Sequence, residues 1–347
     1  MSAALREATR TRMRAQRRKD LTRSAIVLAA LVVLIVVLVL TSALLGRPDG
    51  VSAGQALTAM TGRGRGLADY VIFETRMPRA AGALLCGLLF GLAGHLYQSV
   101  VRNPLATPDI IGITAGATAG AVAVIVLAPG MRFGVQAAGL LGALAIVLAV
   151  FALTWRSGLD TYRLVLVGIG VSSVGIAVTN YLFTFAEGTA TAAVLRWTTG
   201  STSFAQWPDA VLLSVVLVVS LGLALALGRG LGALGLGDDL ARGLGVRVHR
   251  VRVAVLVIGA AAAALTTSVV GPIGFVALIS GPIATRLVAR GPHLLLAPLV
   301  GAVLVLAADL PAQHAPLISP VPTGVLTALV GAPVFVWLLL RRRAGTS

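Results

Sequence analysis

Few side chains in this 347-residue chain have the type and spacing that catalysis requires. Four histidines are scattered along it: His95, His249, His293 and His314. Their unrelated positions predict no metal site. The only lysine, Lys19, is followed by Asp20, so the chain lacks the G-x-x-x-x-G-K-[ST] loop that holds ATP phosphates. Residues 230–235 spell G-x-G-x-x-G but follow an apolar run and not a strand, which disfavours dinucleotide binding. We therefore expect no cofactor, no metal and no reaction in this chain.

Three other reactive or polar side chains stand alone within apolar stretches. An acid within a bilayer is costly, so Asp309 needs a role that compensates for it. Either it hydrogen-bonds to or caps its neighbours, or it lines a substrate path. Gln98 is interpreted as an interhelical hydrogen bond or as part of a hydrated pathway, because lipid offers no partner. Cys86 is the single cysteine, so no disulfide can form within the chain.

The elements that carry these residues are membrane spans. Of all residues, 57% are hydrophobic and 12% are charged, and segment 24–45 has no charge at all. A spanning helix needs roughly 20 such residues. The apolar segment is too long for the core of a signal peptide. The net charge of +16 does not indicate nucleic-acid binding, because the arginines lie between apolar runs without interleaved aromatics. We expect an all-α, polytopic membrane protein.

About ten spans are predicted. They cover 24–45, 77–99, 111–128, 135–154, 164–185, 210–227, 252–270, 272–288, 294–311 and 322–340. With the N-terminus inside, all but seven of the 28 Lys and Arg residues fall on the inner side, which is the bias that sets orientation. Both termini are therefore expected in the cytoplasm.

The expected organisation is a single transmembrane domain over 24–342, preceded by a basic cytoplasmic arm over 1–23. The arm suits contact with anionic lipid headgroups. Segment 228–251 is expected to be a cytoplasmic loop. Segments 46–76 and 186–209 are expected to be outer loops, with a short surface helix near Ala192–Trp197.

Small residues recur at helical spacing in the second and third spans. The positions are Gly87, Gly91 and Gly94 in the second span, and Gly112, Gly116 and Gly120 in the third. Stripes of small residues let helix backbones approach closely in lipid. We expect the second and third spans to pack against each other. Between them, Asn103-Pro104 and Thr107-Pro108 interrupt helical geometry and predict a rigid cytoplasmic turn.

Several of these stretches together resemble the FecCD-type permeases of binding-protein-dependent ABC importers. The matching stretches are "RMPR" (76–79), "GLAGHLYQSVVRNPLATPDIIGITAGA" (91–117), "LGLGDDLARGLGV" (234–246), "GPIGFVALI" (271–279), "AAD" (307–309) and "PTGVLTALVGAPVFVWLLLRR" (322–342). They occur in collinear order over residues 70–342.

The resemblance implies a ten-helix subunit of the cytoplasmic membrane that moves iron-siderophore complexes, haem or cobalamin. It implies a second permease subunit, identical or paralogous, with the substrate path along the interface between the two. Two separate ATPase subunits are implied on the cytoplasmic side, which places ATP and Mg²⁺ in a partner. A substrate-binding protein is implied on the outer side.

The resemblance also assigns roles to residues. Segment 234–246 matches the cytoplasmic loop that couples to the ATPase, through Gly237, Asp238, Asp239, Ala241, Leu244 and Gly245. Local chemistry agrees, because Gly237 or Asp238 can cap a short helix that Gly245 ends. The path or its packing is assigned to Gly87, Gly91, Gly94, Gln98, Asn103, Pro104, Gly112, Gly116 and Asp309.

Arg76 and Arg79 bracket Met77-Pro78 just before the second span, and both are expected to point outward. One interpretation is anchoring to lipid headgroups. The resemblance favours docking onto acidic residues of the binding protein. Two departures from the family pattern bear on this region and on substrate choice. Gly281-Pro282 replaces Pro-His, and Gln313 replaces an arginine that would add a docking contact.

The predicted function is that of a permease subunit for ferric siderophores, powered by ATP hydrolysis in separate subunits. Cobalamin or haem is the alternative cargo. A secondary transporter driven by an ion gradient is the rival from another class. That rival requires paired ionisable residues deep in the membrane, and the sequence offers Asp309 no obvious basic partner.

Overall fold

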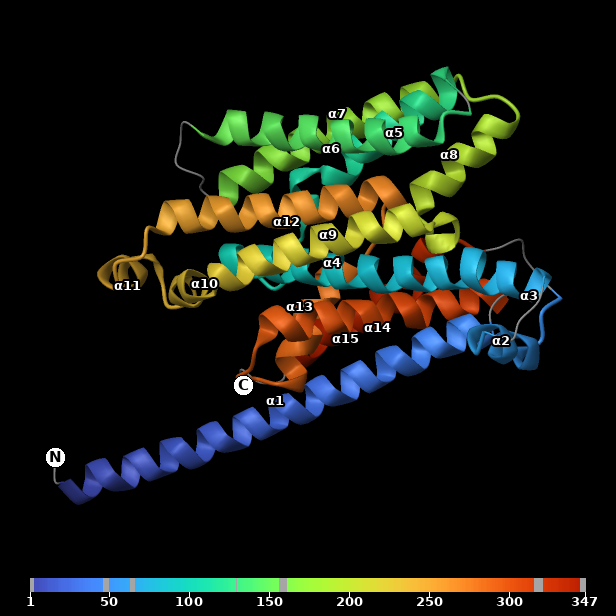
Figure 1. Ribbon diagram of the computed structural model, residues 1–347. Coiled ribbons are helices and arrows are strands. Elements are labelled where there is room, and N and C mark those ends of the chain that lie inside the picture. The colour runs from blue at the N-terminus through green and yellow to red at the C-terminus, as the bar shows by residue number, and fades with distance from the viewer. Residues whose placement is uncertain are drawn as a thin grey trace.

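The long helices of the computed structural model lie side by side along one axis (Figure 1). The structure describes residues 3–45, 50–62, 66–128, 130–155, 161–314 and 321–343. Eight helices in these ranges are long and apolar enough to cross a membrane, and two shorter apolar helices lie among them. Within the same ranges no strand is found. The predicted all-α polytopic fold is confirmed.

The helices long enough to span are α1 (Ala3–Leu45), α4 (Met77–Val101), α6 (Arg132–Trp155), α7 (Thr161–Phe183), α9 (Trp207–Ala226), α12 (Val248–Val270), α14 (His293–His314) and α15 (Thr323–Arg343). The two shorter apolar helices are α5 (Ile113–Leu127) and α13 (Val276–Leu287). Helix α13 is short and contains a proline, Pro282. These ten helices correspond one to one with the ten predicted spans.

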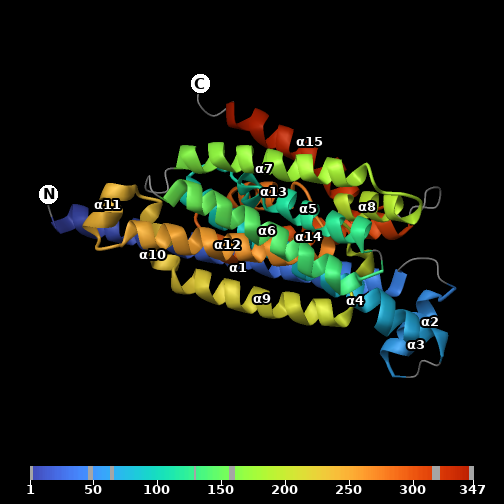
Figure 2. The same cartoon turned by 90° about the horizontal axis from the view of Figure 1, so that it is seen from above.

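Shorter elements lie at the two ends of the bundle. One end holds α10 (Gly228–Leu234) and α11 (Asp238–Gly243), and we call it the α11 end. The opposite end, here the α8 end, holds α2 (Ala53–Met60), α3 (Leu67–Tyr70), the π-helix η1 (Val71–Arg76) and α8 (Thr189–Thr199). The 3-10 helices are η2 (Pro108–Ile111) and η3 (Thr202–Phe204). Helix α1 starts, and α15 finishes, toward the α11 end (Figures 1 and 2).

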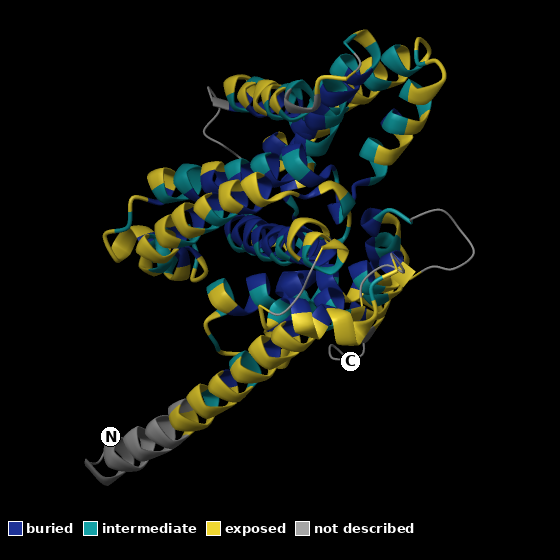
Figure 3. Cartoon of the chain, turned by 45° about the vertical axis from the view of Figure 1, so that its right-hand side comes forward, coloured by how far each residue is buried: buried dark blue, intermediate teal, exposed yellow. Residues whose placement is uncertain are grey.

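Helix α4 is the centre of the packing. Most of its residues are buried, and its apolar and small side chains join those of α12 and α14 in one core. The outward faces of α1, α7 and α9 remain exposed although they are apolar, as at Leu166 and Val218 (Figure 3). Apolar exposure on this scale indicates contact with lipid or another protein.

Two outer segments are more ordered than predicted. The short helix expected near Ala192–Trp197 is present as α8. Segment 46–76, predicted to be a loop, contains α2, α3 and η1. The Ser52 side chain accepts from the Gln55 amide at the start of α2, and the Gln55 side chain accepts from the Ser52 amide. This S-x-x-Q capping box is a sequence signal that could have predicted α2.

Candidate functional site

A buried carboxylate at the α8 end joins four elements. The Arg79 guanidinium of α4 donates to both oxygens of Asp309 in α14, through Nε to Oδ2 at 3.0 Å and Nη2 to Oδ1 at 2.9 Å. The hydroxyls of Thr202 in η3 and Thr323 in α15 donate to Oδ1 at 2.6 and 2.7 Å. Asp309 is 1% exposed. A buried charge is tolerated when it is paired and hydrogen-bonded, as it is here.

Gln313 completes this cluster. Its amide donates to Oδ2 of Asp309 at 2.7 Å and to the Ser42 hydroxyl of α1 at 3.0 Å. The structure therefore agrees with the interpretation of Asp309 as a hydrogen-bonding residue. The expectation that Asp309 has no basic partner was wrong, because Arg79 pairs with it. Gln313 is buried, so the departure from arginine at this position changes an internal contact.

The expected outward orientation of Arg76 and Arg79 is also wrong. Arg76 is 3% exposed and Arg79 is 8% exposed. The Arg76 guanidinium donates to the carbonyls of Ala43 and Leu44 at 3.1 Å each and to Val51 O at 3.2 Å. Residues 43 and 44 lie in the last turn of α1, where carbonyls lack helical partners and a cation is favoured. A docking role for the two arginines stays a prediction.

The glycines of α4 make the close contacts that small residues permit, but with other helices than predicted. A Cβ on Gly87 would lie 2.5 Å from the Ala302 Cα of α14, and one on Gly94 would overlap the Ala277 carbonyl of α13. Gly91 lies in the same way against Ala297 of α14. In α5, a Cβ on Gly116 would overlap the Gly142 carbonyl of α6. The second and third spans thus use their stripes on different partners.

Gln98 makes an interhelical hydrogen bond. Its side-chain amide donates to the carbonyls of Leu278 at 3.0 Å and Ala277 at 3.3 Å, both in α13. A Cβ on Gly281 would overlap the Gln98 amide oxygen. The glycine at this departure from the family pattern therefore leaves room for the Gln98 side chain.

The turn between α4 and α5 is held by local bonds, as the two X-Pro pairs predicted. Asn103 Oδ1 accepts from the Leu105 backbone amide at 2.9 Å, so this bond spans Pro104. Asp109 Oδ1 accepts from the Thr114 amide at the start of α5 at 3.2 Å. Gly112 has φ +82°, and a Cβ there would overlap the Ser172 hydroxyl of α7. Only glycine fits this approach of η2 to α7.

A groove with polar lining lies along α5 and α7. It encloses about 420 Å³, and its polar side chains are Asp109, Thr114, Thr118, Ser172, Ser173, Thr179 and Asn180. Asn180 and Ser173 are exposed, on a helix whose other exposed residues are mostly apolar. The Ser173 hydroxyl donates to the Ile169 carbonyl of the same helix at 2.9 Å, but lipid offers no partner to the Asn180 amide. This face of α7 therefore suits water or another protein.

At the α11 end of the bundle, helix α11 begins at the predicted position. The sequence did not reveal which of its residues face inward. Gly237 precedes it at φ +113°, and Asp238 and Asp239 form its first turn, where acids favour the helix dipole. Gly245 follows at φ +79°. Ala241 is fully buried with Leu234 and Val248, so it packs inside this chain and cannot contact a partner.

The outward face of this region is apolar. Leu236, Leu240 and Leu244 are 61%, 62% and 65% exposed, at intervals of four residues. We call these three residues the α11 leucines. Of them only Leu244 was among the predicted coupling residues. The helical repeat from Leu244 could have predicted Leu240, whereas Leu236 precedes Gly237 and lies outside α11.

Asp238 also carries two ion pairs. Arg252 of α12 donates to its Oδ2 at 2.9 Å, and Arg102, which ends α4, donates to its Oδ1. The hydrogen bond from Arg252 is the main cause that holds the pKa of Asp238 below its usual value, against partial desolvation, and Arg102 adds to the shift. The carboxylate is therefore ionised at neutral pH. Asp239 pairs with Arg242 of the same helix at 2.8 Å.

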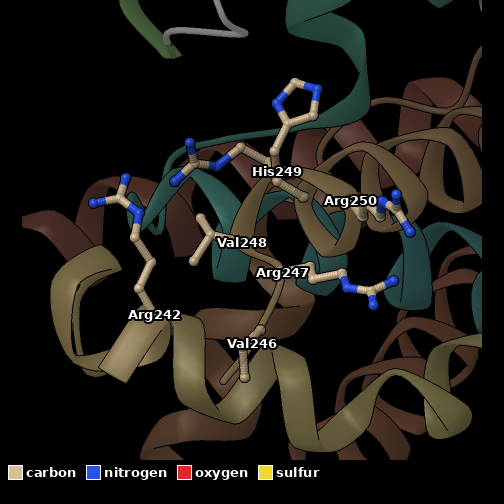
Figure 4. A pocket seen from close by; sticks show the side chains of 7 residues that line it. Arg242, Val246, Arg247, Val248, His249 and Arg250 are labelled. Carbon is tan, nitrogen blue, oxygen red and sulfur yellow. The ribbon is translucent and has the colours of Figure 1, made fainter. Parts of the chain in front are cut away.

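Beside α11 lies a basic pocket of about 440 Å³ (Figure 4). Its charged and polar lining is Arg242, Arg247, His249, Arg250 and Arg252. Helix α12 starts here without a side-chain cap or an acid in its first turn. Positive side chains at the positive end of a helix dipole are unfavourable, and an anion would relieve them. Sequence analysis did not single out this cluster.

Comparison with known proteins places these features in a family. The sequence model of the FecCD transport family matches residues 33–341. A probable siderophore transport system permease protein of Bacillus subtilis is 37% identical, covering 81% of this chain and 85% of its own length. The achromobactin transport system permease protein of Dickeya dadantii is 35% identical, covering 80% of each. A solved metal-chelate type ABC transporter in an inward-facing conformation matches with TM-score 0.81 and 27% identity, covering 91% of this chain and 99% of the other.

Proposed function

The chain belongs to the FecCD transport family, and from that premise we propose that it is the permease subunit of an ABC importer for ferric siderophores. It is a multi-pass protein of the cytoplasmic membrane. Of the two relatives described above, one is by name a probable siderophore transport permease and the other an achromobactin transport permease, and both match the chain over most of its length. The proposed direction of transport is inward, and the energy comes from ATP hydrolysis in separate subunits.

The observation that carries the proposal is the surface of α11. The α11 leucines expose apolar side chains on α11 and on the residues that flank it, at the end of the bundle and outside the long apolar spans. Lipid is not available there if this end is cytoplasmic, as the distribution of basic residues predicts. A groove on an ATPase would cover the row, and that ATPase would hold ATP and Mg²⁺.

The basic pocket supports the same docking surface. Arg242 belongs to α11, and Arg247 and Arg250 lie at the start of α12, so a partner that covers α11 also faces the pocket. Charge complementarity predicts acidic side chains on that part of the ATPase. Apolar contact then supplies affinity, and the charges fix the register of the two subunits.

The groove along α5 and α7 supports a path at a subunit interface. The exposed Asn180 amide would be unsatisfied against lipid. A second permease subunit, identical or paralogous, would enclose this face together with water. The resulting channel would suit a large, hydrogen-bonding metal chelate.

At the α8 end we propose that an extracytoplasmic binding protein docks. Arg76 and Arg79 are buried in this chain, so their contribution to docking is to hold η1 and α4 in place against α1 and α14. A direct charge contact would require a conformational change that frees them. Cobalamin or haem remains the alternative cargo.

An ion-coupled secondary transporter fits less well. Such a protein needs an ionisable group that can take up and release an ion during transport. The most deeply buried acid of the described spans is Asp309, whose carboxylate pairs with Arg79 and already accepts from two hydroxyls and an amide. This saturation supports a structural role.

The test of the proposal removes the apolar row. Replacing Leu240→Glu together with Leu244→Glu should weaken association of the cognate ATPase at least tenfold, because losing about 1.4 kcal/mol of contact is tenfold in affinity. Association is measured by binding of purified ATPase to the permease in lipid nanodiscs. Leu195→Glu, on an exposed position of α8, is the matched control and should bind normally. Unchanged binding by the double variant, with the protein folded, would contradict the proposal.

A further inference from the structure

The two ion pairs of Asp238 join three elements that are far apart in the chain. Arg102 terminates α4, Asp238 opens α11, and Arg252 lies in the first turns of α12. Asp238 and Arg252 are partly shielded, with 28% and 18% of their side chains exposed, whereas the Arg102 side chain is 41% exposed. Shielded charges interact more strongly than fully solvated ones. The carboxylate therefore fastens α11 to two spans at once.

The neighbouring acid shows what an ordinary surface pair looks like. Asp239 pairs with Arg242 within the same short helix, three residues apart, and its side chain is 98% exposed. Such a pair contributes little to stability and cannot hold α11 to another element. The two aspartates are adjacent in sequence, but the ion pairs of Asp238 reach α4 and α12, whereas the pair of Asp239 stays within α11.

Arg102 is placed for this contact by an unusual backbone. It has φ +53°, and only one other non-glycine residue in the described ranges, Phe275, has a positive φ. Helices commonly end with glycine in this left-handed conformation. A residue with a side chain is used here in spite of the strain, and strain of this kind concentrates at functional positions.

The segment that follows Arg102 leads directly to the polar groove. Asn103 fixes the turn, Asp109 caps the start of α5, and both Asp109 and Thr114 line the groove. Because these bonds leave the segment little freedom, a displacement of α11 relative to α4 would reach the groove through Arg102 and not be absorbed on the way.

From this arrangement we propose that Asp238 and Arg102 are positioning residues for transport, transmitting movement of the ATPase-bound α11 to the groove between α5 and α7. The inference rests on the proposed function of α11 as the docking helix. It assigns the transmission to one carboxylate and one guanidinium, whereas docking itself is assigned to the α11 leucines.

The experiment compares Asp238→Asn with Asp239→Asn in proteoliposomes that hold the complete importer. Both changes remove one charge from the first turn of α11, so they are matched in composition and in their effect on the helix dipole. The measured quantity is ferric siderophore taken up per ATP hydrolysed, with the siderophore that gives the highest uptake in cells.

We expect Asp238→Asn to lower that ratio by roughly fivefold or more, which is the lower range of energetic coupling between two sites. Arg102→Ala should lower it similarly, since alanine bears the same backbone strain at positive φ and loses only the ion pair. Arg102→Lys should restore part of it. Asp239→Asn should lower the ratio less than Asp238→Asn does, because the pair that it breaks lies within α11 and reaches no other element.

A purely structural role would not move this ratio, because loss of folded complex lowers uptake and hydrolysis together. Equal ratios for the Asp238 and Asp239 variants would overturn the inference. Failure of the proposed function would be seen separately, as normal ATPase binding by the Leu240→Glu and Leu244→Glu protein. If that protein loses the ATPase while the Asp238 variant transports normally, only the inference fails.

Discussion

At the scale of single residues, the buried Arg79–Asp309 pair sets the chemistry of the α8 end. The sequence showed an acid in an apolar span and two arginines before another span, but not that they meet. The two residues are 230 positions apart, and pairing over that distance leaves no local pattern. The A-D motif indicated that Asp309 matters, and only the packing of α4 on α14 shows why.

This pair allows a quantitative prediction. Arg79→Met should destabilise the protein by about 3–5 kcal/mol, because it leaves a buried carboxylate without its cation. Combining it with Asp309→Asn should recover part of that loss, since the change removes the unpaired charge and keeps an acceptor oxygen for the Thr202 and Thr323 hydroxyls. The measurement is the thermal unfolding midpoint of the purified variants in detergent. A double variant no more stable than Arg79→Met would show that the charge is not the cause.

At the scale of elements, the length of the apolar runs predicted the ten spans, and the family resemblance together with the capping residues predicted α11. The glycine stripes predicted close helix approach. The stripes could not predict which helices pack together, because a small residue permits contact without selecting a partner. Ala241 shows the same limit, since spacing placed it on α11 but not on the inward face with Leu234 and Val248. The capping box at Ser52 was a signal that went unused.

Gly94 tests the packing of α4 on α13. Gly94→Leu should force the two helices apart, because even a Cβ would overlap the Ala277 carbonyl. The cost should reach at least the ~1–3 kcal/mol typical of overpacked sites. Gly222→Leu in α9 is the control, since nothing lies within 4 Å of a Cβ there.

Yield of monodisperse protein by size-exclusion chromatography is the readout for both glycine variants. The Gly94 variant should be lost and the Gly222 variant retained. Equal yields would mean that α13 can move without harm. On the same reasoning, Gly116→Leu is expected to separate α5 from α6, and not the second span from the third.

At the scale of the whole molecule, each end of the bundle has a distinct surface. The α11 end carries the α11 leucines and the basic pocket, and the α8 end carries short helices held by buried arginines. The polar groove on α5 and α7 lies on the side of the bundle. A chain with three such surfaces and no nucleotide-binding loop is suited to work as one subunit of a larger transporter.

The most direct test of this account is uptake of radioactive ferric siderophores by a strain that lacks this chain, with and without its return on a plasmid. We predict that the returned chain restores uptake, that depletion of ATP abolishes it, and that dissipating the proton gradient while ATP is maintained does not. The Leu240→Glu and Leu244→Glu protein should fail to restore it although it reaches the membrane. Restored uptake that persists without ATP and stops when the gradient is dissipated would contradict the account and favour an ion-coupled transporter.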